Sequence, residues 1–98
     1  MMATVKLELN EKNQGGFNLY QNDLKIGEMA ISISSDELTV YHTEVDEAFA
    51  GQSLAKVLLD EMVAYVRANM LKVIPLCPYV FAQFKRHPDE FADIWKQN

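Results

Sequence analysis

The chain changes its hydrophobic period twice, and this limits its fold more than any other feature of the sequence. Up to Val45, apolar residues mostly alternate with polar ones, as they do in half-buried strands. From Gln52 to Met70 they recur at intervals of three and four residues, as on one face of a helix. A short apolar run from Leu71 to Leu76 then has the length of a buried strand. The pattern therefore predicts a set of strands followed by a helix and one more strand.

The first half of the chain predicts four strands joined by short turns. The strands are expected around residues 5–9, 17–19, 24–34 and 38–45, with turns at Asn13–Gly16, Gln21–Asp23 and Ser34–Glu37. Because consecutive strands with short connections pair as hairpins, the four strands should form an antiparallel meander.

The second half predicts a crossover and two further helices. A strand–helix–strand unit joins parallel strands by a right-handed crossover, so the strand at Leu71–Leu76 should lie parallel to the fourth. Cys77 and Pro78 open a helix that ends in the cations Lys85–His87, and Pro88–Glu90 starts a last short helix. We expect one domain over residues 1–98, with an α+β or α/β fold: a four-stranded antiparallel meander, a helix, a parallel fifth strand and two C-terminal helices.

Composition excludes several classes of function. The chain has 98 residues, of which 49 % are hydrophobic and 23 % charged, so it is globular with a single core. Its net charge of −5 argues against nucleic acid as a partner, and no apolar run approaches the ~20 residues of a membrane span. Cys77 is the one cysteine, so we expect a reducing, cytoplasmic location. The two histidines and this cysteine show no metal-ligand spacing, and we expect no metal.

Ligands of strand–helix–strand units bind beyond the carboxyl ends of the strands, here the segments Thr43–Ala55 and Leu76–Phe81. The small residues within Ala50–Ala55 let a ligand approach the backbone closely, and Gly51 permits an unusual backbone angle. The first amides of the following helix have no internal partner and attract phosphate. A plain helix start capped by Ser53 explains the same residues.

Three stretches taken together resemble the GNAT superfamily of N-acetyltransferases: Tyr41–Val45, Ala50–Ala55 and Lys72–Tyr79. The chain is most similar to the small single-domain, Yjdj-type members, over roughly residues 24–95. This resemblance implies a sheet whose fourth and fifth strands splay apart, with acetyl-coenzyme A as cosubstrate in the splay. It also implies acetylation of an amine, which the sequence does not identify.

The superfamily binds pyrophosphate with a loop that reads Gln/Arg-x-x-Gly-x-Gly/Ala. The resemblance implies these cofactor-binding residues: Val45 at the end of the fourth strand, then Ala50, Gly51, Gln52, Ser53, Leu54 and Ala55. Two positions depart from the pattern, since Ala50 lacks a basic or amide side chain and Ser53 stands at the glycine position. These departures favour an alternative function, a non-catalytic module that binds acyl-coenzyme A or another protein with a degenerate loop.

Three residues are candidates for the chemistry. Cys77 lies at a helix start, which favours a reactive thiol, and it could protonate the leaving thiolate or carry an acetyl group. The alternative is that Cys77 is a small buried hydrophobic residue. Tyr79 is the rival acid, or a partly buried aromatic residue. His42 is predicted on the strand face of Leu38 and Val40, where it is a candidate base or a packed core residue.

The acceptor site should be open. Larger GNAT enzymes carry helices between their first two strands, whereas Gln14–Gly16 leaves room only for a turn. An open site suits a protein or peptide amine, or requires a partner to complete it.

Overall fold

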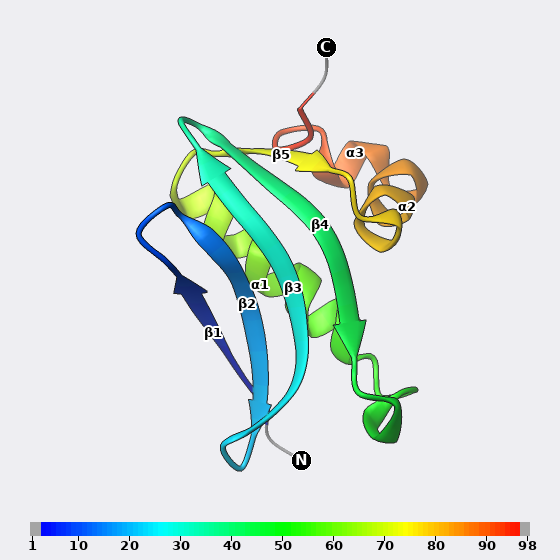
Figure 1. Ribbon diagram of the computed structural model, residues 1–98. Coiled ribbons are helices and arrows are strands. Elements are labelled where there is room, and N and C mark those ends of the chain that lie inside the picture. Colours follow the sequence, from blue (N-terminus) through cyan, green and yellow to red (C-terminus); the bar gives the residue numbers. More distant parts are fainter. Residues whose placement is uncertain (1–2, 97–98) are drawn as a thin grey trace.

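Five strands form one sheet in the order β1-β2-β3-β4-β5 (Figure 1). The computed structural model describes residues 3–96. The strands are β1 (Thr4–Leu9), β2 (Gln14–Gln21), β3 (Leu24–Ser34), β4 (Glu37–Val45) and β5 (Lys72–Pro75). The helices are η1 (Glu47–Phe49), α1 (Leu54–Ala68), α2 (Pro78–Arg86) and α3 (Pro88–Phe91). β1 to β4 pair antiparallel and β5 is parallel to β4, which confirms the predicted meander and crossover.

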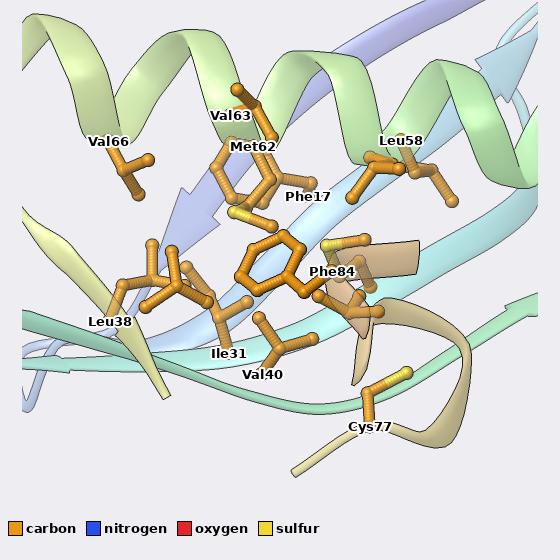
Figure 2. Packing of buried hydrophobic residues seen from close by; sticks show 14 of the residues in the cluster. Phe17, Ile31, Leu38, Val40, Leu58, Met62, Val63, Val66, Cys77 and Phe84 are labelled. Atoms are coloured by element: carbon orange, nitrogen blue, oxygen red, sulfur yellow. The ribbon is translucent and has the colours of Figure 1, made fainter. Parts of the chain in front are cut away.

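One hydrophobic core joins the helices to one face of the sheet. α1 lies behind the sheet in Figure 1, with its apolar stripe turned toward buried residues such as Leu38 and Val40. Phe84 of α2 is fully buried near the centre of this cluster, between α1 and the strands (Figure 2). No helix within residues 3–96 is long and apolar enough to cross a membrane.

The end of the chain covers the outer edge of β5. The predicted last helix stops at Phe91, and residues 94–96 run beside β5. The Val73 N–H donates to the Ile94 carbonyl over 2.6 Å, and the Lys96 N–H donates to the Val73 carbonyl over 2.9 Å. The four-residue β5 is therefore paired on both sides.

The first turn differs from its prediction. Gly15 and Gly16 were expected in the turn, but both lie in β2, and the chain reverses over residues 10–13 instead. A Cβ on Gly16 would stand 2.6 Å from the Met29 carbonyl oxygen. These glycines therefore allow neighbouring strands to approach closely, and they do not form the turn. The other two turns are confirmed.

The strand face predicted for His42 is wrong, because β4 contains a β-bulge. Ile31 pairs with Val40 and Ala30 pairs with His42, which leaves Tyr41 as an extra residue without a partner. An extra residue shifts the alternation by one position. Val40 therefore faces the core, whereas the His42 side chain is 54 % exposed on the opposite face of the sheet.

Candidate functional site

β4 and β5 separate soon after they pair. Their register runs only from Glu37–Lys72 to Val40–Pro75. The Cys77 N–H donates to the Val40 carbonyl over 2.9 Å, and α2 then leads the chain away while β4 continues to Val45 (Figure 1). The carboxyl half of β4 is thus left without a strand on this side, which opens the sheet.

A groove of about 590 Å³ occupies this opening. Its wall combines the end of β4, the loop before α1, the first turn of α1 and one residue of α2. The residues that line it are Thr43, Glu44, Val45, Phe49, Ala50, Gly51, Ser53, Leu54, Ala55, Lys56 and Tyr79. The two segments predicted to carry function therefore meet in one place, although 20 residues separate them in sequence.

Not every predicted site residue lies in the groove wall. Val45, Tyr79 and most of the Ala50–Ala55 loop line it, whereas Gln52, Cys77 and His42 do not. Cys77 is 1 % exposed and belongs to the hydrophobic cluster (Figure 2).

Four residues that line the groove were not predicted as site residues: Thr43, Glu44, Phe49 and Lys56. The Thr43 hydroxyl lies 3.3 Å from the Cys77 sulfur, within hydrogen-bond distance. Thr43 is thus the residue that contacts both the groove and the thiol. Lys56 could have been found from helical spacing, since it lies in the first turn of α1. The face of the sheet on which Thr43 lies depends on the bulge at Tyr41, and the local sequence pattern does not show that bulge.

The loop before α1 has two residues with left-handed backbone angles. Gly51 has φ of 85°, a conformation that favours glycine. Ser53 has φ of 58° and ψ of 28°, and its side chain makes no capping hydrogen bond. Ser53 is therefore the N-cap residue of α1 by position, but its hydroxyl does not cap the helix as the helix-start explanation expected. The first backbone N–H groups of α1 lack intrahelical partners and lie at the positive end of the helix dipole.

Two side chains in the groove wall, Lys56 and Tyr79, have shifted pKa values. The hydrogen bond and charge of Asp60 raise the pKa of Lys56, whose Nζ lies 3.0 Å from the Asp60 Oδ1. Burial raises the pKa of Tyr79, an effect that the nearby Lys56 charge opposes. The Lys56 ammonium is therefore ion-paired with Asp60, and the Tyr79 phenol keeps its proton at neutral pH.

Residues 16–94 match the family model described as GCN5-related N-acetyl-transferase. The chain belongs to this family. The match covers most of the sequence, from β2 to the segment that pairs with β5. The resemblance found in Tyr41–Val45, Ala50–Ala55 and Lys72–Tyr79 is thereby confirmed at the level of the family.

Solved structures show the same fold. A GCN5-like protein from Staphylococcus aureus is 23 % identical, with a TM-score of 0.70 over 97 % of this chain and 89 % of that one. The ribosomal-protein-S18-alanine N-acetyltransferase from Escherichia coli is 19 % identical, with a TM-score of 0.62 over 67 % of this chain and 43 % of that one. This chain therefore spans less than half the length of the Escherichia coli enzyme. No curated protein matches the chain by sequence.

A third structure contains coenzyme A. The PaiA N-acetyltransferase from Thermoplasma acidophilum, solved in complex with coenzyme A, is 12 % identical to this chain. Its TM-score is 0.54 over 60 % of this chain and 37 % of that one. At this identity the likeness establishes a common fold.

Proposed function

We propose that this GCN5-related chain transfers the acetyl group of acetyl-coenzyme A to an amine. The observation that carries the proposal is the groove between the diverging strands β4 and β5. It unites an unpaired strand edge, a helix start with free amides and a phenol that keeps its proton, in a chain that belongs to an acetyltransferase family.

The volume and the residues of the groove support acetyl-coenzyme A as the cosubstrate. Its volume of about 590 Å³ is within the range of small-molecule sites, roughly 300–1,000 Å³. The backbone at Val45 would hold the pantetheine arm, as an added strand pairs with a sheet edge. The amides at the start of α1 and the Lys56 ammonium would hold the pyrophosphate. Ala50 adds no polar side chain, so this chain would bind phosphate with its backbone and Lys56.

Tyr79 is the proton donor that we propose for the departing thiolate. Transfer from a thioester requires an amine in its neutral form and a proton for the leaving sulfur. Tyr79 lines the groove, and burial favours its neutral phenol. Cys77 remains a candidate acid behind Thr43, but its buried sulfur does not line the groove.

The acceptor would approach across an open sheet face. Within residues 3–96, α1 packs behind the sheet and no helix covers β2 to β4 in front (Figure 1). Glu44 lines the groove and is exposed on this side, so its carboxylate is available to an incoming ammonium. An exposed amine of a protein or peptide fits such a site.

Calorimetric titration with acetyl-coenzyme A and with free coenzyme A tests the proposal first. We expect micromolar binding of both, followed by acetyl transfer to at least one member of a panel of peptide and small-molecule amines. Binding without transfer to any amine would favour the non-catalytic module. Absence of binding at millimolar ligand would refute the proposed cosubstrate.

Two variants test the role of Tyr79. Tyr79→Phe should lower kcat by about 100- to 10,000-fold while cosubstrate affinity stays within a factor of two or three. Tyr20→Phe is the matched control, because Tyr20 lies on β2 and its hydroxyl donates to the Glu8 carboxylate, away from the groove residues. Equal kcat values for the two variants would exclude Tyr79 as the acid.

A further inference from the structure

Three side chains able to bind a metal meet on the sheet face opposite α1. Glu28 of β3 and Glu44 of β4 are direct cross-strand partners, and His42 precedes Glu44 by two residues on the same face. One ligand atom from each residue lies within 4.8 Å of the other two. The His42 Nε2 is 3.6 Å from the Glu28 Oε2 and 3.9 Å from the Glu44 Oε1.

The sheet register holds like charges together here. Two carboxylates directly opposite each other destabilise an antiparallel pair. Lys25 compensates only part of this repulsion, since its Nζ lies 2.7 Å from the Glu28 Oε1 and leaves Oε2 turned toward His42. The Glu44 carboxylate faces the His42 imidazole. A cation between these groups would turn an unfavourable pair into a favourable one.

The distances suit a small ion with nitrogen and oxygen ligands. Zn²⁺ binds imidazole nitrogen and carboxylate oxygen at about 2.0–2.2 Å, so neighbouring ligands of a tetrahedral site lie about 3.4 Å apart. The two distances from His42 are slightly longer than this. Rotation of the exposed Glu44 side chain and of the Glu28 carboxylate would close the difference without moving the backbone.

We propose that Glu28, His42 and Glu44 form a site for a late first-row divalent cation, of which Zn²⁺ is the best match. The imidazole selects against Mg²⁺ and Ca²⁺, which prefer all-oxygen sites. Three protein ligands leave one position open to water. The site shares Glu44 with the acceptor side of the groove, but its geometry rests on the β3–β4 register and not on the proposed acetyl transfer.

Sequence spacing could not reveal this site. His42 has no histidine or cysteine at ligand spacing along the chain, so no metal was expected. Glu28 is 14 residues away in sequence and reaches His42 only because β3 and β4 pair. The bulge at Tyr41 also contributes, since it moves His42 from the core face to the face of the two glutamates.

Titration of the purified full chain with Zn²⁺ tests the proposal, by calorimetry and by NMR of the histidine ring nitrogens. We expect one Zn²⁺ per chain and a shift confined to the His42 ring. His42→Gln and Glu44→Gln should each weaken binding by at least tenfold, since loss of even an outer partner of a metal ligand costs about 10–100-fold. Both residues are exposed, so circular dichroism should show that the variants fold.

Two control variants decide between this site and others. His87→Gln removes the other histidine, and Cys77→Ala removes the thiol; neither should change the Zn²⁺ affinity by more than twofold. Stoichiometric binding that survives His42→Gln, or that is lost in His87→Gln or Cys77→Ala, would overturn the assignment. Failure of the wild-type chain to bind Zn²⁺ would overturn it as well.

Discussion

Replacing Ser53 with glycine should stabilise the protein. Ser53 has the backbone angles of a left-handed residue, φ 58° and ψ 28°, where a Cβ costs roughly 1–2 kcal/mol. Its side chain is exposed and makes no capping hydrogen bond, so little is lost with the hydroxyl. Glycine also increases the conformational entropy of the unfolded chain, and this reduces the gain in free energy of unfolding by about 0.4–1 kcal/mol. The net gain in free energy of unfolding should be about 0.5–1 kcal/mol.

Thermal unfolding followed by circular dichroism measures this effect. For a chain of this size, that gain corresponds to a rise in Tm of about 2–8 °C. A Tm that stays unchanged or falls in Ser53→Gly would refute the reasoning from the left-handed angle. Gly51→Ala should show the reverse effect, because Gly51 has φ of 85° and any side chain there is strained.

Ser35→Gly separates the conformational effect from the effect on the groove. Ser35 has φ of 55° in the turn between β3 and β4, so glycine should raise Tm there too. Of these two serines, Ser53 lines the groove and Ser35 does not. Ser53→Gly combined with Ala50→Arg should therefore tighten acetyl-coenzyme A binding, by about 2- to 10-fold for one improved hydrogen bond. Ser35→Gly should leave that affinity unchanged. Equal affinities in the wild-type chain, the Ser53→Gly/Ala50→Arg variant and Ser35→Gly would show that the loop departures are harmless or that the cosubstrate binds elsewhere.

Three further predictions concern the core, the acid side of stability and the charge of the groove. Phe84→Ala should lower the free energy of unfolding by about 3–5 kcal/mol in urea denaturation, and a loss below about 1 kcal/mol would contradict its central position. The hydrogen bonds from Arg67 lower the pKa of Asp93 in the folded chain. This pair therefore stabilises the fold fully above the ordinary aspartate pKa of about 3.9, and the stabilisation is lost as the pH falls through the lowered pKa of the folded chain. Asp93→Asn should therefore flatten the acid limb of a stability–pH curve measured by urea denaturation, and an unchanged limb would contradict the linkage. Lys56→Ala should weaken coenzyme A binding by about 2- to 5-fold at low salt, whereas Lys85→Ala, outside the groove, should not; equal effects would exclude a specific role of Lys56.

Much of the fold was predictable because its signals are local. The alternation of Phe17 and Leu19 and the helical spacing from Leu58 to Val66 each reflect one buried face of one element. Pro78 marked the start of α2 correctly, since its ring suits a first helical turn. The pairing order then followed from short turns and from the single handedness of crossovers.

The candidate site was predictable only in part. The structure brings Tyr79 and most of the loop at Ala50–Ala55 into one groove, because both segments follow the carboxyl ends of neighbouring strands. Cys77 was placed at the right helix start, but its burial depends on packing against residues distant in sequence. His42 was placed on the wrong face, since one unpaired residue changes every later position of the strand.

The sequence by itself determined which segments form strands and helices, two of the three turns between the first four strands, and the family to which the chain belongs. These properties depend on residues close together in the chain. The tertiary structure decided three things: the separation of β4 and β5 beyond Val40, the bulge at Tyr41 and the meeting of Glu28 with His42 and Glu44. Each depends on how one strand is aligned with another. A shift of one residue moves a side chain to the opposite face of the sheet, so strand register settles which groups can meet.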